Sequence, residues 1–533
     1  MTDTVIIAPG VAAAPATLDE IGGKAFYLAA LAQARLPVPP AFVLKTEWCR
    51  RHRRGELQPD ELAAALKHGV VQLERITGLG FGSARKPLVV AVRSGAKVSM
   101  PGMLETVLDI GLNDTTVEGL IRATGNPRLA WDSYRRLVGL YAEVVAGLPP
   151  GPFEALTNEA LEAASVLSVR DLDYAALRKL ARAMLDRYRH MRGEPFPQEP
   201  QVQLAGAAEA VLRSWDAPKA AEYRRQMGID DDIGTAVLVQ TMVFGNAGPR
   251  SGAGVGFTRD PATGKDELYL DFQFNAQGED VVAGRHAVDN VALLKARLPS
   301  VWTELDRLRH DLERQFRDAQ DFEMTVQEGR LYLLQTRRAK RTPWAAVQIA
   351  VDLVRAGVAT PAEGLRSLDG IDLATVARSR VVGAGARAVG RATAASLGVA
   401  SGPIALDAEA AARHAASGRA PILVRRDTTT SDIGAMKVAA GVLTAFGGKT
   451  SHAAVVARQL GIVCLVGCSA LEIDPEGRAC TIGSLTLREG DMIGLDANEG
   501  TIYAGAVDTV TDRPTEALAE IRRWSDPTGT MPN

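Results

Sequence analysis

The chain is too long to fold around a single hydrophobic core. It has 533 residues, whereas single cores rarely grow beyond about 250–300 residues, so two to four domains are expected. Its Lys and Arg residues number 61 against 63 Asp and Glu. This near balance argues against a general binder of nucleic acid or of an anionic membrane, because such proteins carry a basic excess or stripe. It leaves room for a local positive pocket that holds a phosphorylated ligand.

The spacing of apolar residues changes along the chain and indicates its domains. We expect strands at 36–44 and 87–96, helices over about 113–225, strands over 233–283, a charged helix at 296–318 and paired strands at 320–326 and 331–337. These elements predict a mixed α/β (α+β) protein. Its expected parts are a first domain at 1–340 with a helical insertion at about 113–225, a helical linker at 341–390 that ends in the glycine-rich run 383–390, a second domain at 391–507 and a tail at 508–533.

The cysteines and the N-terminus bear on the compartment. The four cysteines do not have the spacing of a metal site, so we expect them to be small buried residues in a reducing compartment: Cys49, Cys464, Cys468 and Cys480. The N-terminus lacks the basic and apolar regions of a signal peptide, and no apolar run approaches the roughly 20 residues that span a bilayer. A cytoplasmic protein is expected.

The sharpest local pattern is GGKTSHAAVVAR, at residues 447–458. Thr450 or Ser451 is a good N-cap, and the following residues favour a helix, which places His452 in its first turn. The unpaired N–H groups and the helix dipole there favour an anion, so a phosphoryl group on the imidazole would be well placed. A lone histidine more often caps or packs a helix, but this run of small residues favours the phosphoryl carrier.

A second group of candidates lies on the two strands near 320–337. Asp321 and Glu323 alternate and so share one face of the first strand, while Gln335 and Arg337 share one face of the second. If the strands pair as a hairpin, two carboxylates, an amide and a guanidinium could converge. Carboxylates suit Mg²⁺ beside nucleotide phosphates, and Arg offers a fork to phosphate oxygens. Taken alone, alternating charges on a strand usually mark a solvated face.

A third group is basic and glycine-rich. Lys24 follows two glycines, and Arg93 ends the apolar strand VVAVR. The run Ser251–Gly256, SGAGVG, is expected to be a flexible loop whose free N–H groups could close over phosphates. Each piece is weak by itself, because such glycine runs are often simple turns.

Taken in order, these segments resemble the pyruvate phosphate dikinase family from about residue 19 to residue 507. The resemblance is carried by IGGKAFYLAALAQARLPVPPAFVL, AVRSGAKVSMPGMLETVLDIGLND, VLVQTMVFGNAGPRSGAGVGFTRDPATG, FNAQGEDVVAG, RDAQDFEMTVQEGRLYLLQTRRAKRT and LVRRDTTTSDIGAMKVAAGVLTAFGGKTSHAAVVARQLGIVCLVG. It implies an ATP-grasp nucleotide-binding domain followed by a swivelling domain that carries a phosphorylated histidine.

The resemblance also implies roles for single residues. His452 would be the catalytic carrier, with Arg93 and Arg337 assisting, and Thr450 matches the family's regulatory phosphorylation site. Mg²⁺ would be held by Asp321, Glu323 and Gln335. The implied ATP and phosphate site comprises Lys24, Arg93, Gly252, Gly254, Glu279, Asp321, Glu323, Gln335 and Arg337.

The implied reaction starts with attack of His452 on the β-phosphoryl group of ATP, which releases AMP. Inorganic phosphate then takes the terminal phosphoryl group and leaves as pyrophosphate. The motifs TSHAAVVAR and DFEMT are closer to those of this dikinase branch than to those of the phosphoenolpyruvate synthase branch, where water is the acceptor.

Three departures from the family pattern stand out. The chain ends at Asn533, before the barrel that binds pyruvate or phosphoenolpyruvate in the family, so the barrel is expected to be absent. Phe446 stands in TAFGG where the family usually has Arg, which removes a fixed cation near the histidine. Ala253 stands where Thr is usual, but the backbone N–H groups of that loop remain.

Three functions therefore remain open. The chain could form phospho-His452 from ATP and pass the group to a separate protein or small molecule, including pyruvate bound on another chain. It could be a kinase repurposed for another metabolite. It could also be a regulatory module that binds nucleotide without turnover.

Overall fold

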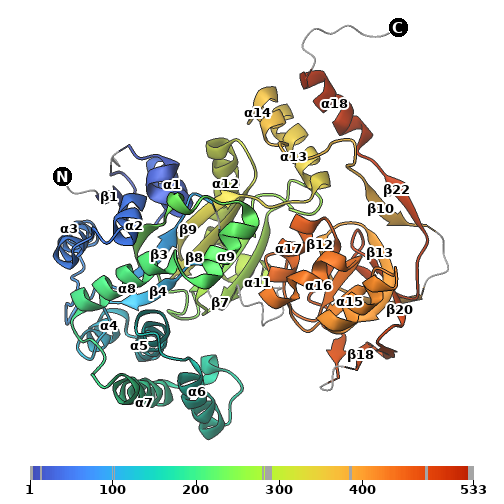
Figure 1. Cartoon of the computed structure of the whole chain (residues 1–533). Coiled ribbons are helices and arrows are strands. Elements are labelled where there is room, and N and C mark those ends of the chain that lie inside the picture. Colours follow the sequence, from blue (N-terminus) through green and yellow to red (C-terminus); the bar gives the residue numbers. More distant parts are fainter. Residues whose placement is uncertain are drawn as a thin grey trace. The chain divides into compact units, whose positions relative to one another are not determined.

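The computed structural model describes residues 4–11, 15–98, 100, 102–278, 281, 291–382, 387–474 and 478–525, and it is a mixed α/β protein as the sequence predicts (Figure 1). Contacts divide the chain into two compact units. Unit 1 comprises Met1–Ser251 and Val326–Arg337, and unit 2 comprises Gly252–Thr325 and Arg338–Asn533. The division between these units falls within the expected first domain at 1–340. The expected domain boundaries at 340, 390 and 507 stay predictions.

Unit 1 contains an antiparallel five-stranded sheet in the order β1-β2-β5-β3-β4. Its central strands are almost wholly buried because helices such as α1 (Leu18–Gln33) and α3 (Pro59–Thr77) pack on the sheet. The strands are β1 (Thr4–Ile7), β2 (Ala41–Leu44), β5 (Ala236–Thr241), β3 (Val90–Gly95) and β4 (Thr106–Ile110).

The predicted helical stretch 113–225 is confirmed. Its amphipathic helices bury an aromatic core in which Phe196 lies edge-on to Tyr134, Tyr141 and Tyr188, with ring centroids 5.3–6.3 Å apart. The helices of the stretch are α4 (Thr116–Thr124), α5 (Pro127–Leu140), α6 (Gly151–Ala164), α7 (Tyr174–Arg192), α8 (Pro200–Ser214) and α9 (Pro218–Met227).

The two strands expected at 320–326 and 331–337 are confirmed as β8 (Gln320–Gln327) and β9 (Arg330–Arg338), neighbours in the sheet order β7-β6-β8-β9. Glu328 and Gly329 join them with φ of 51° and 81°. Two successive residues with positive φ form the type I′ turn that matches the twist of a hairpin. The charged helix expected at 296–318 is α12 (Pro299–Phe316).

The glycine-rich run is not the flexible loop expected from the sequence. It forms β6 (Gly252–Phe257), which is buried throughout and pairs with β7 (Tyr269–Phe274). A Cβ on Gly252 would lie 2.3 Å from the Phe272 ring, and one on Gly254 would lie 2.9 Å from the Asp271 carbonyl oxygen. The glycines therefore make room for the neighbouring strand and its aromatic side chain. Ala253 is likewise buried on this strand.

Residues 341–381 contain α13 (Pro343–Arg355) and α14 (Pro361–Arg366), which pack with α18 (Thr515–Ser525). The stretch then ends in β10 (Arg378–Val381), paired with β22 (Thr509–Asp512). Of the expected glycine linker 383–390, residues 383–386 lie outside the described residues. Residues 387–390 belong to the strand β11 (Arg387–Arg391), and their assignment to a linker stays a prediction.

The remaining described residues contain an eight-stranded sheet in the order β11-β21-β20-β13-β14-β15-β16-β12. They also contain a three-stranded antiparallel sheet of β17 (Leu471–Ile473), β18 (Ala479–Ile482) and β19 (Leu485–Arg488). Side chains alternate along β14, so Leu423 packs under the helices on one face while Ile422 and Val424 join the core of the other face. The further bounds are β12 (Thr393–Ser396), β13 (Val399–Ala405), α15 (Ala408–Ala416), β14 (Ile422–Arg425), α16 (Ile433–Val438), β15 (Gly441–Thr444), α17 (His452–Leu460), β16 (Val463–Val466), β20 (Met492–Asp496) and β21 (Thr501–Ala504).

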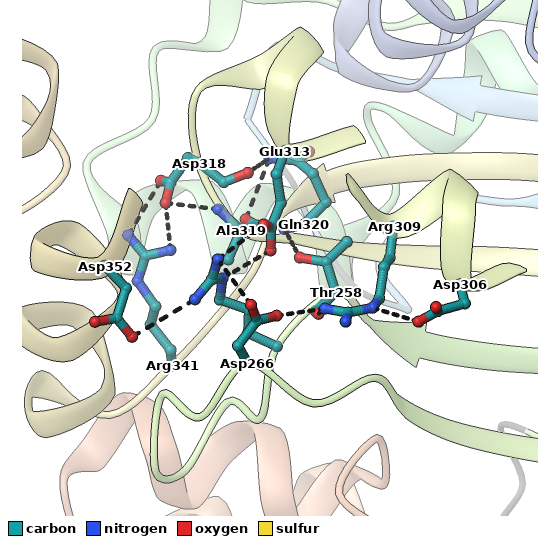
Figure 2. Close-up of polar contacts among 11 residues, drawn as sticks. Thr258, Asp266, Asp306, Arg309, Glu313, Asp318, Ala319, Gln320, Arg341 and Asp352 are labelled. Atoms are coloured by element: carbon teal, nitrogen blue, oxygen red, sulfur yellow. Dashed lines mark hydrogen bonds and ion pairs between the residues drawn. The ribbon is translucent and has the colours of Figure 1, made fainter. Parts of the chain in front are cut away.

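A buried ionic network fixes the start of β8 (Figure 2). Arg259 donates to both carboxylate oxygens of Glu313 on α12, at 2.9 and 3.1 Å, and the two side chains are only 4% and 2% exposed. Gln320 exchanges hydrogen bonds with Thr258, next to this pair. Figure 2 also shows Asp318 binding the guanidinium of Arg341, with contacts of 2.6 and 3.1 Å. Because buried charges are costly when unpaired, this network fixes where β8 begins.

We predict that Glu313→Gln destabilises unit 2 strongly, because it removes the nearest and most buried carboxylate of Arg259 and, among the described residues, leaves only Asp266 and Asp352, at 3.7 and 3.6 Å. Removal of one partner of a buried pair costs about 3–5 kcal/mol. Urea unfolding, with hydrogen exchange of α12 and β6, measures the change. Asp311→Asn on the same helix is the matched control, since its pair with Arg314 is exposed and should contribute at most ~0.5 kcal/mol. Equal effects of the two variants would contradict the role assigned to the network.

Candidate active site

His452 lies at one edge of the eight-stranded sheet. The strands β14, β15 and β16 are parallel, so their carboxyl ends meet at the same edge. The loop after β15 leads directly into α17, and the loop after β14 lies beside it, where the Phe446 N–H donates to the Arg426 carbonyl oxygen at 3.0 Å. Ligand sites of open α/β sheets lie at such edges.

Local geometry places the imidazole at the start of the helix. Ser451, one of the two N-caps that the sequence allows, is extended, and its side chain accepts a hydrogen bond from the N–H of Ala454. His452 is therefore the first helical residue. Its Nδ1 lies 3.3 Å from the hydroxyl of Thr428, which is 4% exposed and follows β14. This contact fixes one ring nitrogen and leaves Nε2 for other chemistry.

The surroundings keep the imidazole neutral near pH 7. Burial lowers the pKa of His452 below its ordinary value, because it penalises the charged form more than the nearby carboxylates of Asp427 and Asp432 favour that form. Asp432 is itself buried and accepts a hydrogen bond from the Thr429 N–H at 2.8 Å. A neutral imidazole is the form that acts as a nucleophile.

The residues just before His452 contact the β6–β7 region of unit 2. Lys449 forms an ion pair with Asp260, and its backbone N–H donates to the Tyr269 hydroxyl at 3.0 Å. The Tyr269 hydroxyl and the Thr450 hydroxyl both donate to the carboxylate of Asp271. A Cβ on Gly448 would lie 2.5 Å from that carboxylate, so only glycine fits there. Burial raises the pKa values of Asp271 and Tyr269.

A buried cation lies two turns along the same helix. Arg458 is 3% exposed, donates to the Ala395 carbonyl oxygen at 3.1 Å, and lies over the ring of Phe257. Burial lowers the pKa of Arg458 to about 10, against opposing effects of Cys464 and Asp321. The Asp321 carboxylate on β8 and the histidine helix are thus electrostatically coupled within unit 2.

Two predicted phosphate-binding residues of unit 1 lie at β3, Lys24 beside the strand and Arg93 on it. Gly22 has φ of 69° at a kink inside α1, and a Cβ there would lie 2.0 Å from the Gly95 carbonyl oxygen, so this part of α1 packs directly against β3. A side chain built at Gly95 would lie 3.9 Å from the Cβ of Lys24. Arg93 points to the same side of β3 as Gly95, since side chains alternate. Its Nε is buried without a hydrogen-bond partner among the described residues.

The other candidates divide between the units. Gln335 and Arg337 lie on the part of β9 that belongs to unit 1, where the Leu333 N–H donates to the Pro37 carbonyl oxygen at 2.7 Å. Asp321 and Glu323 lie on the part of β8 that belongs to unit 2. The convergence of all four side chains stays a prediction. Glu279 lies outside the described residues.

The residues proposed for Mg²⁺ have suitable donor atoms. Asp321 is 5% exposed and Glu323 is half-buried, and both offer hard carboxylate oxygens on the same side of β8. Within the described ranges, no group of three or more His, Cys, Asp or Glu side chains is arranged to hold a metal ion. A site from these residues would need the Gln335 amide, nucleotide phosphates or water as further ligands.

Sequence reasoning missed the residues that surround His452. Thr428 lies in a run of three threonines, and Asp271 lies in the strand YLDFQF, where an acidic residue among aromatic ones is the only signal. Asp260, Tyr269 and Arg458 gave no usable pattern. Asp260 and Tyr269 contact the site from a distant part of the sequence, and Arg458, on the same helix as His452, is buried by the fold, so these roles depend on tertiary structure.

Two known domain families match the chain. The family described as "Pyruvate phosphate dikinase, AMP/ATP-binding domain" matches residues 56–302, and "PEP-utilising enzyme, mobile domain" matches residues 419–500, which include His452. The chain is therefore similar to the AMP/ATP-binding domain of pyruvate phosphate dikinase and to the mobile domain of PEP-utilising enzymes. Arg93, Gly252 and Gly254 fall within the first match, and the ATP-grasp class expected from the sequence is confirmed for the first domain.

Curated relatives extend the match over nearly the whole chain. The pyruvate, phosphate dikinase of Clostridium symbiosum is 42% identical over 511 residues, which cover 95% of this chain and 58% of that protein. The Rhizobium meliloti enzyme is 38% identical over 533 residues, with the same shares. The chloroplastic pyruvate, phosphate dikinase 1 of Zea mays is 40% identical over 494 residues, which cover 92% of this chain and 52% of that protein.

The chain thus spans between half and three fifths of the length of these dikinases. The expected absence of a barrel rested on where the chain ends, and the comparisons do not support it. Among the described helices, none is long and apolar enough to cross a bilayer. The cytoplasmic location stays a prediction.

We predict that Asp427→Asn lowers the pKa of His452 further. The Asp427 carboxylate favours the imidazolium, and its removal leaves burial less opposed. The amide keeps an oxygen that can accept the Thr428 N–H bond. An NMR titration of the imidazole measures the shift. Glu409→Gln, an exposed change on α15, should leave the titration unchanged, and an upward shift in Asp427→Asn would contradict the assignment.

We also predict that Gly22→Ala loosens the packing of the start of α1, which carries Lys24, against β3. The added Cβ would collide with the Gly95 carbonyl oxygen, and the φ of 69° is unfavourable for alanine. The combined cost is about 2–4 kcal/mol, measured by urea unfolding and by hydrogen exchange of α1 and β3. Gly10→Ala is the control, because φ there is 77° but nothing lies within 4 Å. Similar losses in both variants would exclude the collision as the cause.

Proposed function

We propose that this chain takes a phosphoryl group from ATP onto His452 and passes it to an acceptor, as the front half of a pyruvate phosphate dikinase. The observation that carries the proposal is the placement of His452. It is a half-buried imidazole at a helix N-terminus, with one nitrogen bonded to Thr428 and with a pKa below its ordinary value.

The proposal assigns one ring tautomer to His452, with the proton on Nδ1. If Nδ1–H donates to the Thr428 hydroxyl oxygen, Nε2 keeps its lone pair and is the nucleophile. Nε2 attacks the β-phosphorus of ATP, a new N–P bond forms, and the bond to the α-phosphate oxygen breaks, so AMP leaves. Inorganic phosphate then takes the terminal phosphoryl group and departs as pyrophosphate, which leaves phospho-His452. The N-terminal N–H groups of α17 favour the added negative charge.

The nucleotide would be held by the residues that the family resemblance assigns. Lys24, Arg93 and Arg337 would neutralise phosphate oxygens, and Gly252 and Gly254 would line the phosphates from a strand. Support comes from the buried Nε of Arg93, which has no protein partner among the described residues. In such transfers, positioning and charge neutralisation supply most of the catalysis.

Mg²⁺ is the proposed metal cofactor, held by Asp321, Glu323 and the amide oxygen of Gln335. When bound, it would neutralise phosphate charge during transfer. The protein residues orient the triphosphate and keep the transferred group facing Nε2. Thr450, whose hydroxyl donates to Asp271, is the proposed regulatory residue, because its modification would remove that bond.

The acceptor is proposed to be pyruvate bound on a barrel, in this protein or on another chain, or a different small molecule. ATP and inorganic phosphate are the other proposed partners. A role in binding nucleic acid or a membrane is not proposed, since the net charge is −2.

The test is incubation of the protein with Mg²⁺ and ATP labelled at the β-phosphate. We expect acid-labile label on the protein and one AMP released per label. His452→Ala should abolish the label, and Thr428→Val should slow its appearance by about 10-fold or more, since it removes the hydrogen bond that sets the tautomer.

The outcomes separate the alternatives. A protein that binds ATP and forms no phosphohistidine would be a nucleotide-binding regulatory module. If phospho-His452 forms without inorganic phosphate, water is the acceptor of the terminal phosphoryl group. Label that pyruvate fails to discharge, even with a barrel supplied, would favour another metabolite as the acceptor.

A further inference from the structure

Phe446 leaves the loop after β15 without a side-chain cation at the position where the family pattern has arginine. A phosphoryl group on His452 would lie close to two carboxylates, since Asp427 and Asp432 both affect the imidazole. A dianion beside carboxylates needs a compensating positive charge. The question is which cation of this chain supplies it.

Most cations near this edge already have anionic or carbonyl partners. Arg425 lies 3.4 Å from Asp432 and donates to the Leu406 carbonyl oxygen. Lys449 is paired with Asp260. Arg458 is buried and donates to Ala395. None of the three can turn to a phosphoryl group without giving up a bond or leaving a buried position.

Arg426 differs from all three. Its side chain is exposed, and its guanidinium carbon lies 5.2 Å from the ring centroid of Phe446. Within the described part of the chain, no carboxylate lies within ion-pair distance of it. Stacking on an aromatic ring orients a guanidinium and leaves its N–H groups to bind an anion.

Backbone structure keeps Arg426 beside the histidine loop. Its carbonyl oxygen accepts the Phe446 N–H, and Arg425 accepts the Ala445 N–H at 3.1 Å, so the two loops continue the parallel pairing of β14 and β15. Two residues after Arg426, Thr428 contacts Nδ1 of His452. The segment that fixes the imidazole therefore also carries the arginine.

We propose that Arg426, stacked on Phe446, is the cation that binds the phosphoryl group carried by His452. The guanidinium of Arg426 thus stacks on the ring of Phe446, and the positive charge comes from the loop after β14 instead of the loop after β15. The chemical class recognised is a phosphoryl or pyrophosphoryl group on an imidazole nitrogen. This inference rests on the proposed function of His452.

Two routes to phosphohistidine test the proposal independently of the ATP site. One is β-labelled ATP with Mg²⁺. The other is phosphoramidate, which transfers its phosphoryl group to the imidazole nitrogen and releases ammonia. For each route, the rates of labelling and of label loss are measured on the full chain, with His452→Ala subtracted as background.

Arg426→Ala should slow labelling by both routes or speed loss of the label by roughly 10-fold or more, the ratio that one hydrogen bond to a charged group typically gives. Arg426→Lys should recover part of the loss. Arg426→Ala combined with Phe446→Arg should recover most of it, because the cation returns from the neighbouring loop. A merely structural role for Arg426 would not be rescued from position 446.

Arg419→Ala is the matched control, since it removes another exposed arginine of the same domain. It should label and lose label as the unmodified chain does. The proposal is overturned if Arg426→Ala behaves like Arg419→Ala, or if the double variant is no better than Arg426→Ala. If ATP gives no label while phosphoramidate does, the proposed function fails, and the phosphoramidate route still decides the role of Arg426.

Discussion

The parallel pairing of β14, β15 and β16 is the constraint on which the candidate active site depends. Parallel strands need crossover connections, and here α16 and α17 provide them on one face of the sheet. All loops that follow these strands therefore lie at one edge. That arrangement places Thr428, Phe446 and His452 together, although the sequence separates the first from the last by 24 residues.

Small residues let the helix approach the sheet closely. Ala453, Ala454 and Ala457 are fully buried against the strands, and Gly448 leaves room for the carboxylate of Asp271. Close approach brings the N-terminus of α17 and its unpaired N–H groups to the edge where an anion would bind. The run of small residues in the sequence thus has two uses. Its alanines let the helix pack closely on the strands, and Gly448 lets the preceding loop approach Asp271.

Charge is distributed unevenly around the imidazole. Burial lowers the pKa of His452 more than the nearby carboxylates raise it. The nucleophile is therefore neutral while its surroundings are anionic. Most neighbouring cations are held in ion pairs or in the protein interior. Few cations near His452 are therefore available to bind a phosphoryl group. The proposed role of Arg426, stacked on Phe446, follows from this shortage.

Local patterns predicted much of the secondary structure. The helices of 113–225, the hairpin of β8 and β9, and the helix that starts at His452 all follow from periodicity, turn residues and capping. The glycine run was misjudged because its role is tertiary. Gly252 and Gly254 accommodate Phe272 and the backbone of β7, and no local signal separates that use from a flexible loop.

The sequence by itself determined the mixed α/β class, the position of His452 at a helix start and the likeness to the dikinase family, because these depend on short-range pattern and on motif order. Only the tertiary structure decided that Thr428 holds the imidazole, that Lys24 lies beside β3, and that Asp271 meets the loop before His452. These contacts join residues that are distant along the chain. They form only when whole strands and helices bury their apolar faces, and that burial is a property of the complete fold.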